Sequence, residues 1–221
     1  MTPTPVPFFD TAFAIVANGA PLMHPAERMA FCLCGQGAVY CDREPLTWHQ
    51  VTDRPTALPE TLQVVGDLDS LGDAGLPPHL VTDLHDDQET NDLTKAFRWL
   101  TAHYAPKLVE WFCVTGKRED HTLSNLALIA SFGLPGRIYT HSGFFWVLPA
   151  GNWEISAGEK SPISFLSFVP QRISATGVHW PVERLLLEHL WQATLNRTDA
   201  ATVLLTCEAP LLVYQPWEKQ S

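Results

Sequence analysis

Short apolar runs alternate with helical patterns along the first two-thirds of the chain. Four of these runs, residues 13–17, 30–34, 62–65 and 109–114, have strand character, and a glycine follows each of them within two residues. Brief, continuously apolar strands with helical segments between them are typical of a parallel sheet that is covered on both faces. The pattern therefore predicts an α/β arrangement for this part of the chain.

Two helices are predicted in the same region. One begins at Thr90 or Asn91, whose side chains are suited to capping, and runs to about residue 102. The second begins near Asp120 and ends before Gly133, because glycine is favoured just past a helix C-terminus. Both carry apolar residues at helical spacing, so each helix can bury one face against the sheet.

The pattern of predicted elements changes after about residue 136. Strand-like segments recur at residues 144–148, 164–169, 202–206 and 211–214, and turn residues rather than helices separate them. Consecutive strands of this kind indicate a separate β domain. The predicted class is therefore α/β, with a mostly parallel N-terminal α/β sandwich domain over residues 1–136 and a C-terminal all-β sandwich domain over residues 137–221.

Composition narrows the classes of function. The 221 residues carry a formal net charge of −10, and the only adjacent basic pair of note is Lys117-Arg118, which disfavours nucleic acids and anionic membranes as partners. No apolar stretch is long enough to span a bilayer, and the Pro-rich start lacks the basic region of a signal peptide. Five cysteines without a Cys-x-x-Cys pair favour reduced thiols. We therefore expect a cytoplasmic protein.

Two aspartates follow the third predicted strand directly. Residues two apart in an extended chain point to the same side, so we expect Asp67 and Asp69 to aim both carboxylates at one point. That point would lie at the carboxyl end of a parallel strand, where α/β sheets bind ligands. Two convergent carboxylates suit Mg²⁺. The alternative, a solvated acidic turn, has similar weight because Asp-x-Asp is a common pattern.

The segment that leads into the first predicted helix is also rich in polar residues. Asp92 is a possible third metal carboxylate, and Gln88 and Lys95 are placed to reach a nucleotide. Each has a plainer explanation. An aspartate in a first helical turn stabilises the helix dipole, and a helical lysine is ordinarily solvated.

A third polar segment joins the fourth predicted strand to the second helix. Its backbone N–H groups, together with Lys117 and Arg118, are suited to contacting phosphate. It is not a P-loop, because Trp111 stands where the first glycine of that motif belongs and Arg118 stands where Ser or Thr belongs. Asp120 is equally suited to capping the helix.

Taken together, these three segments resemble a known family. The sequences GDLDSL, DQETNDLTKAF and TGKREDHTLSNLAL, which begin at Gly66, Asp87 and Thr115, look like the three signatures of thiamine pyrophosphokinases in the right order. Looser similarities lie at Asn18-Gly19 and Gly37-Ala38, and, in the last third, at SFLSFVP, TGVHW and LNRT. The resemblance covers most of the chain.

The resemblance implies a Mg²⁺-dependent enzyme that transfers diphosphate from ATP to the hydroxyl of thiamine, giving thiamine diphosphate and AMP. It implies that the N-terminal domain holds ATP and Mg²⁺, that the β domain helps to hold thiamine, and that the enzyme is a homodimer with its sites at the interface. The implied residues are Asp67, Asp69 and Asp92 for the metal, Arg118 for catalysis with them, Gln88, Lys95, Lys117, Asp120 and Asn125 for the nucleotide, and Trp180 and Asn196 for thiamine.

Two departures from the family pattern keep an alternative open. Gln36 stands where the family usually has an acidic residue, and Lys117 replaces the second glycine of a Gly-Gly pair. A catalytically weak relative that binds thiamine or a nucleotide as a sensor would tolerate both changes. A phosphatase of the Asp-x-Asp type is disfavoured by Leu71, and nothing beyond Asp-x-Asp itself supports a glycosyltransferase.

Overall fold

The fold is described from a computed structural model, for residues 4–5, 12–34, 36–41, 43, 61–69, 76–87 and 89–217. The chain divides into two compact units. The α/β unit comprises Phe8–Asn125 and Tyr139–His141, and the β unit comprises Met1–Pro7, Leu126–Ile138 and Ser142–Ser221. The expected α/β class with a β sandwich is confirmed.

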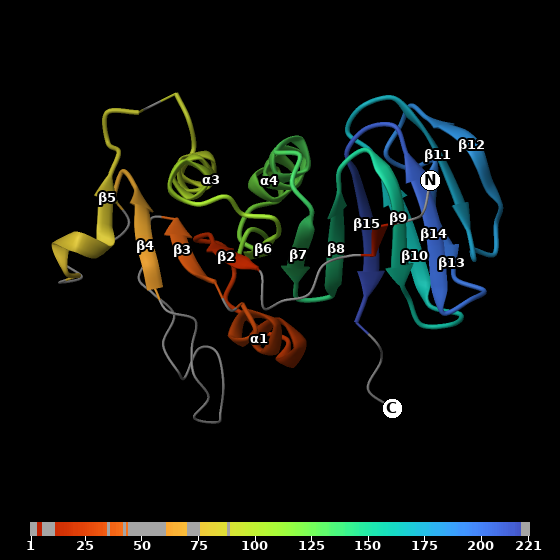
Figure 1. Cartoon of the computed structure of the whole chain (residues 1–221), viewed down its shortest axis with the longest axis horizontal. Coiled ribbons are helices and arrows are strands. Elements are labelled where there is room, and N and C mark those ends of the chain that lie inside the picture. The colour runs from red at the N-terminus through yellow and green to blue at the C-terminus, as the bar shows by residue number, and fades with distance from the viewer. Residues whose placement is uncertain are drawn as a thin grey trace. The chain divides into compact units, whose positions relative to one another are not determined.

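A parallel sheet forms the centre of the α/β unit (Figure 1). Its strands lie in the order β6-β2-β3-β4-β5. Their bounds are Val109–Phe112 for β6, Phe13–Val16 for β2, Gly37–Cys41 for β3, Thr61–Gly66 for β4 and Val81–Asp83 for β5. Strands β2, β3 and β6 are buried along their whole length, as expected of a sheet covered on both faces. All five strands run the same way, so their carboxyl ends share one edge of the sheet.

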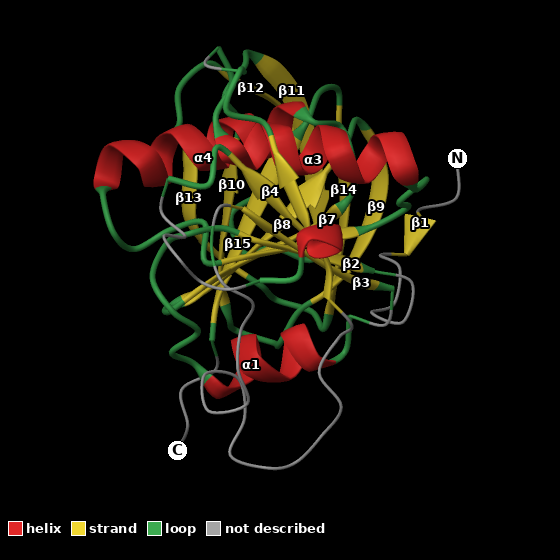
Figure 2. Cartoon of the chain, turned by 90° about the vertical axis from the view of Figure 1, so that its left-hand side faces the viewer, coloured by secondary structure: helices red, strands yellow, loops and turns green. Residues whose placement is uncertain are grey.

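Helices cover both faces of this sheet. Helix α3 (Asp92–His103) lies against one face, and α1 (Pro25–Cys32) lies against the other (Figure 2). Helix α4 (Glu119–Ser131) follows β6, and a short 3-10 helix, η2 (Pro78–Leu80), precedes β5. Both long helices begin where the sequence predicts, and Asn91 is the cap of α3. Among the described residues, no helix is both long enough and apolar enough to cross a membrane.

The prediction of a strand at residues 30–34 is wrong, because most of that segment is the end of α1. The residues that precede this segment favour a helix over a strand. His24 caps the helix and accepts a hydrogen bond from the Ala26 N–H, Pro25 occupies the first turn, and the Glu27 carboxylate accepts hydrogen bonds from the Met23 and His24 N–H groups. A capping box of this kind fixes a helix start, and the short apolar run then supplies its buried side.

The β unit is a sandwich of two antiparallel layers. One layer has the order β9-β14-β11-β12, with β1 added in parallel at the β9 edge, and the other has the order β13-β10-β15-β8. The strand bounds are Thr4–Pro5 for β1, Gly143–Leu148 for β8, Gly151–Ser156 for β9, Pro162–Leu166 for β10, Gln171–Thr176 for β11, Val182–Leu187 for β12, Ala193–Arg197 for β13, Thr202–Cys207 for β14 and Leu211–Pro216 for β15; β7 (Gly136–Thr140) precedes them.

The core of the sandwich follows the alternation of its strands. In β14, Val203, Leu205 and Cys207 are buried, whereas Leu204 between them is 44% exposed. Ile163 and Phe165 of β10 belong to the same buried cluster. Side chains two apart on a strand share a face, so each layer presents one apolar face to the other and one face to solvent.

The alternation in β14 makes a matched pair of substitutions informative. Leu205→Ala should lower the free energy of unfolding by about 2–5 kcal/mol, because it removes buried methyl groups and leaves a cavity. Leu204→Ala should change it by less than about 1 kcal/mol, because nearly half of that side chain already contacts water. Urea unfolding measures both values. Equal losses in the two variants would contradict the inward orientation of Leu205.

Candidate active site

A buried lysine organises the carboxyl end of the parallel sheet. The Lys95 side chain is only 2% exposed, and its Nζ lies 3.3 Å from Asp92 Oδ1 and 3.9 Å from Asp67 Oδ2. Asp67 follows β4 directly, whereas Asp92 and Lys95 lie one turn apart at the start of α3. A buried ammonium is tolerated only next to compensating charge, so this ion cluster ties the start of α3 to the end of β4.

The turn between the two predicted metal aspartates differs from the expectation. Leu68 has a φ of 65°, in the left-handed region, so the chain from Asp67 to Asp69 is not extended. The prediction of an extended segment from Asp67 to Asp69 is therefore wrong. Asp67 turns toward Lys95, and Asp69 is exposed, with its N–H 3.4 Å from Asp67 Oδ1. The structure brings Asp67 and Asp92 together and leaves Asp69 at the surface of the same strand end.

One atom of this cluster points to a further ligand. Asp92 Oδ1 is buried and makes no hydrogen bond among the described residues, although Lys95 Nζ lies nearby. Mg²⁺ binds through one or two carboxylates and takes its other ligands from water and phosphate. The pair Asp67 and Asp92 fits that donor set. In the part of the chain that is described, no group of three His, Cys, Asp or Glu side chains is arranged to hold a metal without such added ligands.

The loop after β6 places two cations at the same edge of the sheet. Lys117 Nζ donates to Asn18 Oδ1 at 3.1 Å, which joins this loop to the one after β2. Arg118 makes a forked contact with the exposed carboxylate of Asp120, with Nε to Oδ1 at 3.0 Å and Nη2 to Oδ2 at 2.6 Å. Both cations are exposed and can reach an anionic ligand. Asn18 belongs to the Asn18-Gly19 segment that resembles the family, but its contact with Lys117 is visible only in the structure.

The remaining predicted nucleotide residues divide into two cases. Asn125 is part-buried, and its side chain donates to the Val114 carbonyl at 2.8 Å, so it fastens α4 to the end of β6. Gln88 lies outside the described residues.

Gln36, the first departure from the family pattern, is exposed, and its N–H donates to the Ala12 carbonyl at 3.2 Å. That backbone bond does not depend on the identity of the side chain.

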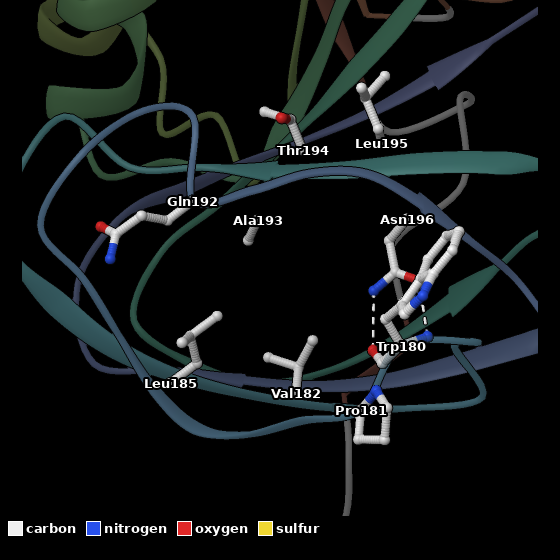
Figure 3. A pocket seen from close by; sticks show the side chains of 9 residues that line it. All are labelled: Trp180, Pro181, Val182, Leu185, Gln192, Ala193, Thr194, Leu195 and Asn196. Carbon is white, nitrogen blue, oxygen red and sulfur yellow. Dashed lines mark hydrogen bonds between the residues drawn. The ribbon is translucent and has the colours of Figure 1, made fainter.

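The two predicted thiamine residues lie together in a pocket of the β unit that encloses about 310 Å³ (Figure 3). The pocket lies between β12 and β13, which are edge strands of the two layers. Val182 and Leu185 face Ala193 across it, and Trp180 and Asn196 stand at one end. Its walls combine apolar side chains with the polar side chains of Gln192, Thr194 and Asn196, a mixture found in pockets for small organic molecules.

Asn196 holds the tryptophan in place. Its Oδ1 accepts a hydrogen bond from the Trp180 N–H at 3.1 Å, and its Nδ2 donates to the Trp180 carbonyl at 2.9 Å (Figure 3). Asn196 is almost completely buried, whereas Trp180 is 55% exposed. The backbone of Trp180 is therefore fixed at both polar groups while its indole remains open to a ligand.

The Arg118–Asp120 fork has a measurable consequence for titration. The hydrogen bonds from Arg118, and then the one from the His121 N–H, lower the pKa of the Asp120 carboxyl to about 2. A carbon-detected NMR titration should show this midpoint, and Arg118→Gln should move it toward the ordinary value of 3.8. Since the folded-state pKa is the lower one, the fork stabilises the fold fully above pH 3.8 and less as the pH falls toward 2. An unchanged midpoint in Arg118→Gln would contradict the fork.

Comparisons with known proteins concern the β unit and the overall fold. Residues 143–214 match the family model described as thiamin pyrophosphokinase, substrate-binding domain. A search among curated proteins finds no significant sequence match.

Several solved structures share the fold. The thiamine pyrophosphokinase from Bacillus subtilis has a TM-score of 0.74 at 19% identity, over 94% of this chain and 99% of that chain. The enzyme from Candida albicans gives 0.71 at 13% identity, over 97% of this chain and 93% of that chain. The yeast enzyme gives 0.70 at 12% identity, over 93% of this chain and 86% of that chain. The chain thus has the fold of the thiamin pyrophosphokinases, and its residues 143–214 are similar to the substrate-binding domain of that family.

Proposed function

We propose that this protein is a thiamine diphosphokinase, which transfers the diphosphate of ATP to the hydroxyl of thiamine and releases AMP. The observation that carries the proposal is the ion cluster of Asp67, Asp92 and Lys95, in which a buried carboxylate oxygen lacks a hydrogen-bond partner. The cluster lies at the carboxyl end of a parallel sheet, which is the usual ligand-binding edge in α/β proteins. The similarity of residues 143–214 to the thiamin pyrophosphokinase substrate-binding domain and the shared fold support the same activity.

The acidic side chains would hold Mg²⁺ with the diphosphate of ATP. Asp67 and Asp92 are the ligands that the geometry favours, and exposed Asp69 at the same strand end is a third candidate. When bound, Mg²⁺ neutralises charge on the diphosphate and makes its phosphorus a better electrophile. The Lys95 side chain is buried, so its ammonium group is not available to contact a nucleotide directly. Its role in this proposal is to hold the two carboxylates in their bound orientation before the ligand arrives.

The loop after β6 would supply positive charge on the other side of the diphosphate. Transfer of this kind depends mainly on positioning and charge neutralisation, and a guanidinium recognises phosphate oxygens through two parallel N–H bonds. Arg118 is held in a fork by Asp120, so binding would exchange one anionic partner for another. Lys117 adds a second cation beside Asn18. Gln88 and Asn125 complete the proposed nucleotide site.

The pocket of the β unit would hold thiamine. Thiamine carries a permanent positive charge on its thiazolium ring, and the face of an exposed indole attracts a cation by about 0.5–2 kcal/mol. Trp180 offers such a face, and Asn196 fixes its position. We further propose that the protein is a cytoplasmic homodimer, and that the nucleotide site and the thiamine pocket meet at the subunit interface.

The alternative function is that of a sensor that binds thiamine or a nucleotide without efficient turnover. The contact between Lys117 and Asn18 favours it, because the lysine is engaged with another loop and is absent from the usual family pattern. A protein that binds both thiamine and Mg-ATP and yet releases no AMP would establish this alternative.

A single substitution tests the metal site. Asp92→Asn keeps the shape of the side chain but removes the charge, so turnover of thiamine with Mg-ATP should fall at least about 100-fold and the Mg²⁺ concentration needed for half-maximal rate should rise. The matched control is Asp86→Asn, because the Asp86 side chain is 96% exposed and lies outside the ion cluster. Near-normal activity of Asp92→Asn at ordinary Mg²⁺ would contradict the proposed site, provided that circular dichroism shows an intact fold.

A further inference from the structure

The indole of Trp180 makes its ring contact with a histidine that is itself held in place. The rings of His179 and Trp180 meet edge to face, with centroids 4.8 Å apart and planes at 85°. Among the contacts of the described residues, this is the ring contact that Trp180 has. Its backbone is fixed by Asn196, but those hydrogen bonds leave the side-chain torsions free. The imidazole of His179 is therefore the neighbouring ring that is placed to restrict the orientation of the exposed indole.

An aspartate fixes the imidazole from the other side. His179 Nδ1 lies 3.0 Å from Asp199 Oδ2, and the second oxygen of that carboxylate lies 3.8 Å from Arg197 Nη2. Backbone bonds anchor the same residues: the His179 N–H donates to the Arg197 carbonyl at 2.8 Å, and the Asp199 N–H donates to the Gly177 carbonyl at 2.9 Å. The three side chains thus form a connected row that ends on the indole.

The carboxylate of Asp199 also affects the charge near the pocket. Arg197 is half-buried at the end of β13, the strand that lines the pocket, and its positive charge disfavours a cationic ligand nearby. Asp199 stands between this guanidinium and His179 and offsets that charge. An uncharged partner for His179 would fix the imidazole equally well but would leave Arg197 uncompensated.

We propose that His179 and Asp199 are positioning residues for the thiamine pocket: Asp199 orients the imidazole, and the imidazole holds the Trp180 indole in the orientation that receives the substrate's aromatic cation. The inference rests on the proposed function for the identity of the substrate. The orientation of the indole is a property of the free protein and can be measured without any substrate.

The first test is spectroscopic. Protein labelled with 5-fluorotryptophan gives one fluorine resonance for each indole, and Trp180→Phe identifies the resonance of Trp180. His179→Ala and Asp199→Ala should both shift that resonance and narrow it, because the indole gains rotamer freedom. Asp199→Asn should leave it near its original position, because the amide oxygen still accepts from the imidazole. An unchanged resonance in His179→Ala overturns the inference, whatever the substrate is.

The control is a second His–Trp ring contact in the same unit, which is stacked rather than edge to face. His189 stacks on Trp191, with centroids 6.1 Å apart and planes at 18°, and Trp191 does not line the pocket. His189→Ala should shift the Trp191 resonance, leave that of Trp180 unchanged and leave thiamine kinetics unchanged. A loss of thiamine affinity in His189→Ala equal to that in His179→Ala would show a general effect of surface histidines and would overturn the inference.

The second test is kinetic and uses a double-mutant cycle. His179→Ala should raise the KM for thiamine by about 2- to 10-fold while the KM for ATP and the melting temperature stay close to those of the wild type. In a Trp180→Ala background the same substitution should have no further effect, because the histidine acts through the indole. Additive effects of the two substitutions overturn the positioning role.

The charge of Asp199 is tested separately from its hydrogen bond. Asp199→Asn should keep the Trp180 resonance but raise the KM for thiamine modestly, because Arg197 is left without its counter-charge. If the wild type neither binds nor turns over thiamine, the proposed function fails while the fluorine results still decide the orientation of the indole. If the wild type turns thiamine over and the cycle is additive, only the positioning inference fails.

Discussion

A lysine that folding removes from water must be surrounded by negative charge, and this constraint fixes the end of the sheet where the chemistry is proposed. Lys95 belongs to α3, and one of its two carboxylates comes from the strand end of β4. Breaking such a pair costs several kcal/mol because a buried charge is left alone. The helix start and the strand end are therefore held together before any ligand binds, and Asp92 is left with one oxygen that lacks a hydrogen bond.

In the β unit, hydrogen bonds rather than ion pairs hold the residues of the candidate site in position. Its pocket lies at the edge of the sandwich, where an unpaired strand edge and an exposed indole would otherwise be loosely ordered. Asn196 satisfies both polar groups of the Trp180 backbone, and the imidazole of His179 contacts its indole. Both sites thus consist of residues whose own positions are fixed by neighbours, which lowers the entropy cost of binding a small molecule.

Sequence patterns predicted the elements that depend on local signals and on continuous burial. Strands β2, β4 and β6 and the helix that Asn91 caps were accessible in this way, whereas the central strand β3 was not predicted. Strands such as β12 were not, because only some of its positions are buried and its sequence mixes charged and apolar residues. A short apolar run such as residues 30–34 fits a strand or a buried helix equally well, and the capping signal at His24 decides for the helix.

The sequence also predicted part of the candidate active site, but not the geometry that brings its residues together. Asp67 and Asp92 were expected to share a site, and they do converge, but on Lys95 rather than through an extended chain, because Leu68 adopts a left-handed conformation that the sequence does not reveal. Spacing also gave no indication that Asn18 would contact Lys117, since the two are distant in sequence and meet only where neighbouring strands end. Contacts of this kind are set by the order of strands in the sheet, and the order is not written in any local motif.

The central claim is that these two sites serve a transfer of diphosphate to thiamine. The most direct measurement is ³¹P NMR of the wild-type protein incubated with thiamine and Mg-ATP, because the spectrum identifies both products at once. The account predicts that thiamine diphosphate and AMP appear in equal amounts, with no ADP. Formation of ADP with thiamine monophosphate, or an unchanged ATP spectrum while both ligands bind, would contradict it.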